Sequence, residues 1–344
     1  MTAMKHVNDF ARLLSGFLNN YLPHERGVSA NTIKSYSYTF ILLVKYLNEH
    51  RNIPLSRLTF SHLNKDMIVD FLDWLQKGRG CGNATRNQRL AAISSFIRYA
   101  EYMNLSHLFD CHQILSIPAK KTESKVLSYL DIDGIKLLLQ QPDIQKPKGV
   151  RDLALLSLMY ESAARVQEII ELTPSSLFIN NKPFRVILCG KGNKQRSIPL
   201  PDKQAALLRH YMNQSSLLNR ENTHKPLFPN NQGQKMSRNG INNILVKYVK
   251  MANEKNSSLV PYHLSCHAMR HSKAMSLLES KVELMYIRDF LGHKSVLTTE
   301  IYARVNPKFT FEAVKNAYKN ITAANIPVWK GNSELMVMLK NLAK

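Results

Sequence analysis

FRVILCGKGNKQRSIPL (Phe184–Leu200) contains the clearest β-strand pattern in this chain of 344 residues. Two short runs, Phe184–Cys189 and Gln195–Leu200, flank the glycine-containing turn Gly190–Lys194. This arrangement predicts a β-hairpin. Most of the sequence on either side has the apolar spacing of helices. We therefore expect a mainly α fold with a small antiparallel β-sheet.

The first 117 residues are expected to form a helical domain. Apolar residues recur at a period close to 3.6 after Ser29, and either Ser29 or Asn31 can cap the first helix. A second helix is predicted over Asn64–Leu75, and a third after the turn Gly78–Gly82, with Asn83 or Thr85 as its cap.

The segment 118–124 contains a proline and a lysine pair but no apolar periodicity, which predicts a linker. We therefore expect an N-terminal domain over 1–117, a second domain over 125–320 and a C-terminal extension over 321–344. An apolar stripe in the extension consists of Trp329, Met336, Leu339 and Leu342. It either packs on its own domain or docks on a neighbouring copy of the chain.

The formal net charge is +22, from 47 Lys and Arg against 25 Asp and Glu, and 44% of residues are hydrophobic. That apolar content supports a packed core and excludes a disordered basic tail. The charge is spread along the chain: residues 1–120 hold 14 basic and 8 acidic residues, and residues 121–344 hold 33 and 17. We expect a polyanionic partner, either nucleic acid or an anionic membrane surface.

Membrane, export and disulfide signals are weak. No run approaches the roughly 18–20 apolar residues of a spanning helix, and the N-terminal residues lack the apolar segment of a secretion signal. The cysteines show no C-x-x-C pair, so neither a zinc ribbon nor a disulfide framework is indicated. They are Cys81, Cys111, Cys189 and Cys266. We expect a cytoplasmic protein without a membrane partner.

The third N-terminal helix has polar first turns that are expected to be exposed. A helix N-terminus that carries Arg and Asn suits phosphate contact and entry into a groove. An ordinary solvated helix face is the alternative interpretation. The candidate DNA-binding residues of the whole chain are Lys34, Arg86, Asn87, Arg89, Lys194 and Arg196.

Four patterns point to chemistry. They are an arginine followed three residues later by an acid, a lysine in the hairpin turn, His-x-x-Arg, and Leu-Gly-His with a tyrosine nine residues after the histidine. In chain order these are Arg165 and Glu168, Lys191, His267 and Arg270, and Leu291–Gly292–His293 with Tyr302. The first pair is expected to share a helix face. Each pattern alone is a weak signal, since an Arg–Glu pair on a helix is usually a surface ion pair.

Together, in this order, the patterns resemble the tyrosine recombinases, the family of the Xer, Cre and phage integrases. The resemblance covers Ser128 to about Val305, and the helical N-terminal part is similar to the family's core-binding domain. It implies a SAM-like core-binding domain followed by an α+β catalytic domain. The catalytic residues that it implies are Arg165, Lys191, His267, Arg270, His293 and Tyr302, with Glu168 in a supporting role.

The implied reaction is transesterification at a DNA phosphodiester. Two arginines can each offer a fork of donors to the phosphate oxygens, and two histidines can donate hydrogen bonds or move protons. Lys191 would protonate the departing 5′-oxygen, and Tyr302 would attack and hold the strand as a 3′-phosphotyrosine. The two arginines would do the work of a metal, so neither a metal nor another cofactor is expected.

Several assignments stay open at this point. Lys194 competes with Lys191, and His267 is a buried structural residue in the alternative interpretation. We expect His271 to be a helix-packing residue and Glu168 to orient Arg165. The other candidates for the nucleophile, Tyr286 and Tyr318, lack a histidine nine residues upstream and have neighbours that suggest packing.

The family pattern also has departures here. Gly149–Leu172 is strongly apolar, and we expect it to be a helical stretch. Within it, Ser162–Ala164 replaces a Thr-Gly-Leu-like run; because alanine suits helical geometry better than glycine, we expect no loss of activity. This difference and the extended C-terminus favour a mobile-element integrase or transposase over a chromosome-dimer-resolution enzyme.

The leading hypothesis is a site-specific recombinase that clamps double-stranded DNA between its two domains. Protomers would act as a tetramer on DNA, with a dimer at each site. One alternative is a DNA-binding regulator of the same fold that has lost catalysis. The other is a type IB topoisomerase, which relaxes supercoils with the same active-site chemistry.

Overall fold

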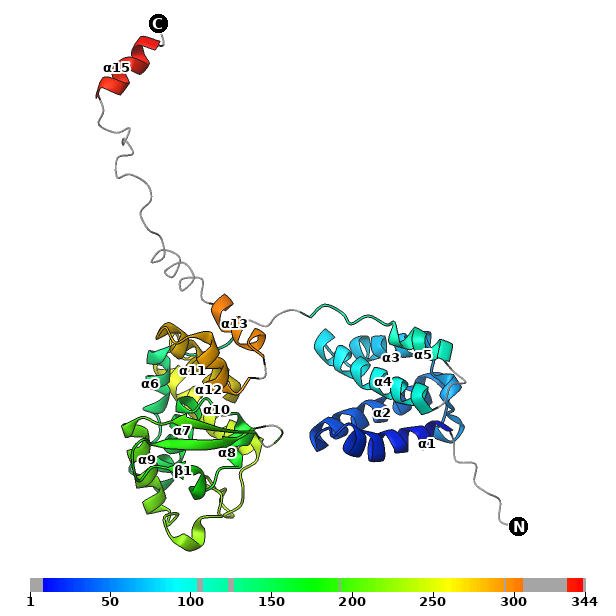
Figure 1. Cartoon of the computed structure of the whole chain (residues 1–344), viewed down its shortest axis with the longest axis horizontal. Coiled ribbons are helices and arrows are strands. Elements are labelled where there is room, and N and C mark those ends of the chain that lie inside the picture. The colour runs from blue at the N-terminus through cyan, green and yellow to red at the C-terminus, as the bar shows by residue number, and fades with distance from the viewer. Residues whose placement is uncertain are drawn as a thin grey trace. The chain divides into compact units, whose positions relative to one another are not determined.

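The computed structural model describes residues 9–103, 108–122, 127–190, 192, 194–293, 295–305 and 333–342. The chain divides into two compact units, Met1–Lys125 and Val126–Lys344 (Figure 1). The division falls beside the segment 118–124 that the sequence marks as a linker. The mainly α fold with a small antiparallel sheet is confirmed.

The first unit is helical, and the three predicted helices form; the third begins at Asn83, which is one of its two candidate caps. Its elements are α1 (Asp9–Gly16), a π-helix (Phe17–Glu25), α2 (Ala30–Arg51), α3 (Lys65–Lys77), α4 (Asn83–Met103) and α5 (Leu108–Leu115), with 3-10 turns at Leu55–Arg57 and Phe60–His62. Ser29 is the N-cap of α2. The Asn64 side chain accepts a hydrogen bond from the Met67 amide at 2.9 Å and so caps α3.

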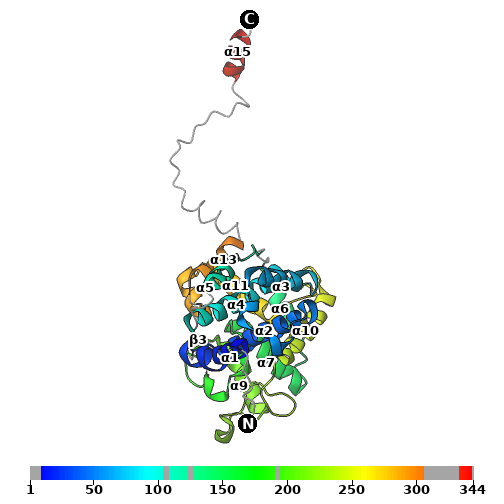
Figure 2. The ribbon, with the colours of Figure 1, turned by 90° about the vertical axis from the view of Figure 1, so that its right-hand side faces the viewer.

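Helices α2 and α4 contact each other across the core of this unit (Figure 2). Phe40 of α2 and Phe96 of α4 meet edge to face, with ring centroids 5.0 Å apart. Phe17 meets Phe96 in the same way at 5.4 Å. Edge-to-face pairs place the positive rim of one ring against the negative face of the other, which adds to the hydrophobic burial.

The expectation that Arg86 is exposed is wrong. Arg86 is 4% exposed, and its guanidinium donates to the Pro118 carbonyl at 2.8 Å. The half-buried Asn87 donates to the Lys120 carbonyl at 2.7 Å and accepts from the Lys120 amide at 3.0 Å. Residues 118–121, the first part of the predicted linker, are therefore held on α4.

The other two N-terminal candidates differ in their surroundings. Arg89 donates to the Ser35 carbonyl at 3.1 Å and lies over the Tyr38 ring at 5.0 Å, so it joins α4 to α2. Lys34 lies on the exposed side of α2. Of the four predicted DNA contacts in this unit, Lys34 is the one whose side chain is mainly exposed.

We predict that Arg86→Met destabilises the first unit, because the Pro118 carbonyl loses a charged donor. The cost should be about 1–3 kcal/mol. Urea unfolding of the full chain, followed by the fluorescence of Trp74 in a Trp329→Phe background, measures it. Arg98→Met removes the same charge from an exposed position of the same helix and is the control. Equal unfolding midpoints for the two variants would contradict a structural role for Arg86.

The second unit contains the hairpin. Its helices are α6 (Ile132–Leu139), α7 (Pro147–Glu161), α8 (Val166–Ile170), α9 (Asp202–Gln214), α10 (Arg238–Lys255), α11 (Cys266–Glu279), α12 (Leu284–Leu291) and α13 (Leu297–Val305), with 3-10 turns at Pro174–Ser176 and Arg220–Asn222. Its strands β1 (Leu177–Phe178), β2 (Arg185–Cys189) and β3 (Gln195–Pro199) form an antiparallel sheet in that order. The predicted hairpin is confirmed, and the Gly190 amide donates to the Lys194 carbonyl at 2.8 Å across its neck.

The predicted helical stretch Gly149–Leu172 is broken. Helix α7 ends at Glu161, and α8 begins at Val166. Between them Ala163 takes a left-handed backbone conformation, with φ of +46°. Glycine favours this conformation and alanine does not, so the expectation that alanine continues the helix here is wrong.

Helix α15 (Ser333–Leu342) lies in the C-terminal extension. Its Val337, Met338, Leu339 and Leu342 are exposed. Trp329 lies outside the described residues. Among the helices that the structure describes, none combines the length and the apolar character needed to cross a membrane.

Candidate active site

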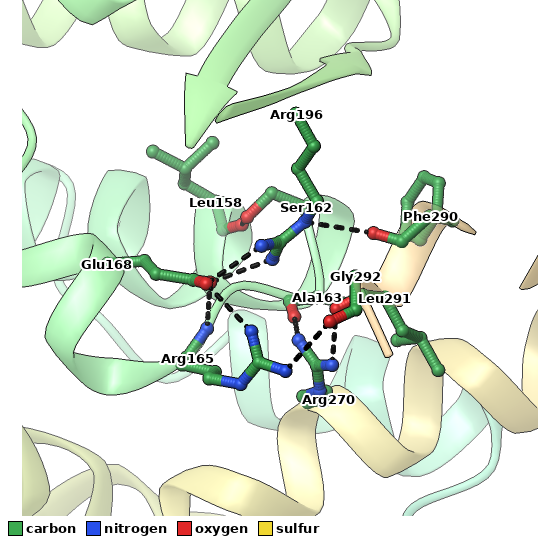
Figure 3. A network of polar contacts seen from close by, with 10 residues as sticks. All are labelled: Leu158, Ser162, Ala163, Arg165, Glu168, Arg196, Arg270, Phe290, Leu291 and Gly292. Atoms are coloured by element: carbon green, nitrogen blue, oxygen red, sulfur yellow. Dashed lines mark hydrogen bonds and ion pairs between the residues drawn. The ribbon is translucent and has the colours of Figure 1, made fainter. Parts of the chain in front are cut away.

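A buried carboxylate organises the site. Glu168 is 4% exposed, and its two oxygens accept four hydrogen bonds (Figure 3). Arg196 donates from Nη1 to Oε1 at 2.8 Å and from Nη2 to Oε2 at 2.7 Å. Arg165 donates from its backbone amide at 2.7 Å and from Nη1 at 2.9 Å. A carboxylate has about four acceptor sites, so Glu168 is fully satisfied.

Arg165 and Glu168 are joined differently from the expected pair on one helix face. Arg165 has extended backbone angles and is the N-cap of α8. Glu168 is the third residue of that helix, and its side chain reaches back to the Arg165 amide, as in a capping box. The break at Ala163 therefore sets Arg165 at the start of a helix, where its side chain stays 40% exposed.

Arg270, on α11, is 1% exposed. Its Nη1 donates to the Ala163 carbonyl at 2.7 Å and its Nη2 to the Leu291 carbonyl at 2.5 Å. Its buried Nε has no hydrogen-bond partner among the described residues. Burial, with the charges of Arg165 and Arg196, lowers the pKa of Arg270 to about 10.

The Leu-Gly-His motif forms the end of α12. Three guanidinium groups donate hydrogen bonds to successive backbone carbonyls at this helix end. The pairs are Arg196 Nε with Phe290 (3.1 Å), Arg270 Nη2 with Leu291 (2.5 Å) and Arg165 Nη2 with Gly292 (3.2 Å). A helix C-terminus carries partial negative charge, so these cations are favourably placed. Gly292 caps α12 with φ of +63°.

Glycine is favoured at position 292 for a second reason. A Cβ atom there would lie 3.1 Å from Arg196 Nη1 and 3.2 Å from Arg196 Cδ. The motif's glycine therefore gives the turn its left-handed conformation and leaves room for Arg196.

Tyr302, on α13, is 1% exposed and packs in a small apolar cluster with Ala163 and Leu291. Its hydroxyl lies 2.9 Å from Nδ1 of His271. The His271 ring meets that of His267 edge to face, with centroids 4.5 Å apart. Burial raises the pKa of Tyr302, and Arg270 partly offsets this rise.

All three histidines of the site have depressed pKa values. Partial desolvation and the charges of Arg270 and Arg165 lower the pKa of His267, although its side chain remains exposed. Burial and neighbouring charges lower the pKa values of His271 and His293 to about 4. Each is therefore neutral at pH 7. Nδ1 of His293 lies 3.0 Å from the hydroxyl of the buried Thr299. This contact orients the imidazole ring of His293.

Several sequence assignments change or stay untested. Arg196 is predicted as a DNA contact, but its guanidinium is bound inside the protein and its side chain is 12% exposed. His267 is exposed, contrary to its alternative as a buried residue. Tyr286 is 65% exposed, contrary to the expected packing. Lys191 and Tyr318 lie outside the described residues. Lys194 is exposed beside the turn.

Two residues of the site were misjudged from sequence. His271 was expected only to pack, yet it meets the Tyr302 hydroxyl across 31 positions of sequence, and no local pattern predicts that pairing. For Arg196 a signal exists: the residues two and four positions later are Ile198, on β3, and Leu200, directly after it, and both are buried. Alternate residues of a strand share a face, which indicates that Arg196 points inward.

The described residues contain no group of three or more His, Cys, Asp or Glu side chains able to hold a metal ion. The site instead offers positively charged hydrogen-bond donors and a hydroxyl group that can give up a proton. Arg165 presents unused guanidinium donors, Arg270 has an unpaired buried donor, and a tyrosine hydroxyl lies against a neutral imidazole.

The chain is similar to known proteins over both of its units. The model of the phage integrase family matches residues 128–308, and that of the phage integrase N-terminal SAM-like domain matches residues 15–102. The chain is 34% identical to a putative integrase/recombinase, y4rC, of Sinorhizobium fredii, over 87% of this chain and 88% of that protein. It is 32% identical to the tyrosine recombinase XerD of Staphylococcus epidermidis, over 83% and 92%.

The fold has a solved counterpart. The XerH site-specific recombinase, in a pre-cleavage complex with its difH substrate, superposes with a TM-score of 0.65 and 19% identity, over 88% of this chain and 85% of that one. The chain belongs to the phage integrase family, the tyrosine recombinases.

We predict that acid destabilises the second unit through its histidines. The pKa values of His271 and His293 are about 4 in the folded protein and about 6.5 in the unfolded chain. The unfolded chain therefore binds more protons below pH 6.5, and stability falls as the pH drops from about 6.5 to about 4.

Thermal unfolding at pH 7 and at pH 4.5 measures this loss. His271→Gln removes one titrating group and keeps a side chain that can bond to Tyr302, so its midpoint should fall less than that of the wild type. His210→Gln, at an exposed position of α9, should behave as the wild type. The same acid-induced fall in all three proteins would contradict the assignment.

Proposed function

We propose that this protein exchanges DNA strands at specific sites through a covalent 3′-phosphotyrosine formed by Tyr302. The observation that carries this proposal is that Arg270 donates to the carbonyls of Ala163 and Leu291, while Tyr302 packs in one apolar cluster with these same two residues. It brings a nucleophile and a phosphate-binding cation together from α7–α8, α11, α12 and α13. The relatives named as recombinases and integrases support the same activity.

Two guanidinium groups would bind the scissile phosphate. Arg165 uses Nη1 and Nη2 in one hydrogen bond each, and a guanidinium has five N–H donors. Its exposed side chain keeps donors for the non-bridging oxygens. Arg270 would contribute the unpaired Nε donor. Donors already in place at the developing negative charge lower the barrier to transfer.

The proton of the nucleophile has a nearby acceptor. The phenol of Tyr302 is protonated at neutral pH because its pKa is raised, and the neutral His271 ring can accept at Nδ1 when its proton is on Nε2. As the bond from Oη to phosphorus forms, the phenolic proton passes to His271. The bond from phosphorus to the 5′-oxygen breaks, and Lys191 donates a proton to that oxygen, while the neutral His293 can donate a hydrogen bond.

The described conformation keeps the nucleophile away from solvent. Tyr302 and Arg270 are each 1% exposed, so a DNA phosphate reaches them only after α13 moves relative to α11. We propose that DNA binding supplies this movement, which would limit cleavage to assembled complexes. The cytoplasm, where the DNA substrate lies, is the proposed site of action.

A covalent adduct tests the proposal directly. Because the DNA site is unknown, the wild-type protein first selects its site from a random-sequence duplex library, and a duplex with that site and a nick beside it traps the cleaved strand. We expect wild-type protein and Tyr286→Phe to form a protein–DNA band that survives denaturation. Tyr302→Phe should form none, because it lacks the attacking oxygen.

The outcomes separate the competing functions. No adduct with the wild-type protein would contradict the proposal and favour a DNA-binding regulator. An adduct accompanied by relaxation of any supercoiled plasmid, without exchange between two selected sites, would favour topoisomerase activity. Exchange that depends on the selected site would support recombination.

We further propose that protomers assemble on DNA as a dimer per site and a tetramer per exchange, with α15 docking on a neighbouring copy. Its exposed Val337, Met338, Leu339 and Leu342 would supply an apolar face. Ending the chain at Asn320 should weaken cooperative assembly on two-site DNA and leave single-site binding intact.

A gel-shift titration against one-site and two-site duplexes measures assembly. The double substitution Leu339→Ser and Leu342→Ser is the matched variant, because it keeps the chain length and removes part of the apolar face. Unchanged cooperativity in both variants would contradict a docking role for α15.

A further inference from the structure

We propose that Arg196 is a positioning residue for the recombination reaction: through Glu168 and the Phe290 carbonyl it fixes Arg165 and the Leu-Gly-His turn in the geometry that binds the scissile phosphate. This inference rests on the proposed function. It replaces the expectation from sequence that Arg196 contacts DNA.

Arg196 is the main charge partner of Glu168. Burial alone would raise the pKa of Glu168, but the hydrogen bonds and charge of Arg196, together with Arg165, hold it below its ordinary value. The carboxylate therefore stays ionised inside the protein. An ionised buried group needs a partner with good geometry, and the two parallel bonds from Arg196 provide it.

This pairing determines what Arg165 can do. Because Arg196 takes one acceptor position on each oxygen, Glu168 needs only the backbone amide and Nη1 of Arg165 to be satisfied. Nη2 of Arg165 then lies against the Gly292 carbonyl. Without Arg196, Arg165 would be the remaining cation hydrogen-bonded to Glu168, and its fork would turn toward the carboxylate and away from a phosphate.

Arg196 also ties the hairpin to the turn after α12. Its Nε donates to the Phe290 carbonyl at 3.1 Å, and its side chain occupies the space where a Cβ at Gly292 would lie. On the hairpin side, a Cβ at Gly190 would be 3.4 Å from Glu168 Oε1 and 3.8 Å from Arg196 Nη1. The side chain of Arg196 thus contacts three segments and sets the distance between them: the hairpin neck, the start of α8 and the end of α12.

Arg196 is not placed to bind the phosphate itself. Nε, Nη1 and Nη2 each donate inside the protein, and its side chain is 12% exposed, against 40% for Arg165. Its effect on the reaction must therefore pass through the residues it holds.

The test compares two Arg→Lys substitutions on neighbouring strands. Arg196→Lys keeps the charge beside Glu168, so the fold is retained, but it loses the paired fork and the bond to Phe290. Arg185→Lys, on β2, changes an exposed arginine that stacks on Phe178. Full-length proteins are assayed on the nicked duplex carrying the selected site, for dissociation constant, single-turnover rate of adduct formation and thermal midpoint.

We expect Arg196→Lys to form the adduct about 10- to 100-fold more slowly than wild type, as for a slightly misplaced catalytic group. Its DNA dissociation constant should stay within about threefold, since Arg196 makes no phosphate contact. Arg185→Lys should match the wild-type rate. A wild-type rate for Arg196→Lys would overturn the inference, as would a loss of DNA affinity as large as the loss of rate.

A double-substitution cycle identifies the route of the effect. If Arg196 acts through Glu168, then Glu168→Gln should itself be slow. Adding Arg196→Lys should then slow the reaction further only by the part that passes through the Phe290 carbonyl, which is less than it slows the wild type. If the fold-reductions in rate for the two substitutions multiply in full, Arg196 acts independently of Glu168, and the inference is overturned. Absence of any adduct with the wild-type protein would instead contradict the proposed function, so the two failures are distinguishable.

Discussion

The geometry of the site depends on one buried carboxylate. Glu168 lies inside the second unit, and its charge is compatible with that position only because Arg165 and Arg196 fill all of its acceptor sites. Removing one partner of such a group leaves a buried charge uncompensated, which is strongly destabilising. The carboxylate therefore fixes where the helix start, the hairpin and the end of α12 meet.

Two irregular backbone features lie close to this carboxylate and its arginines. The left-handed backbone at Ala163 ends α7 early and turns its carbonyl toward Arg270. The left-handed backbone at Gly292 ends α12 and directs three successive carbonyls at three arginines. Local strain at such positions persists when the surrounding contacts determine it, and it is often found at functional sites.

Much of the fold is predictable because its signals are local. The caps at Ser29 and Asn64 and the hairpin Phe184–Leu200 depend on residues within a few positions of each other. The family pattern also picks out Arg165 and Tyr302, because order and spacing are properties of sequence. Helix propensity failed at Ala163, where contacts between segments override it.

What could not be predicted are contacts made across long stretches of chain. Arg86 is a basic residue in the first turn of a helix, and only the fold shows that it binds the Pro118 carbonyl. Sequence predicts DNA contact for Arg196 and packing for His271, because neither Glu168 nor Tyr302 is near them in sequence.

The central claim, that Tyr302 is the nucleophile, is tested most directly by mapping the trapped adduct. After nuclease and trypsin digestion, mass spectrometry should find the residual nucleotide on the peptide Ser295–Arg304; a nucleotide on the peptide containing Tyr286 or Tyr318, or on none, would contradict it.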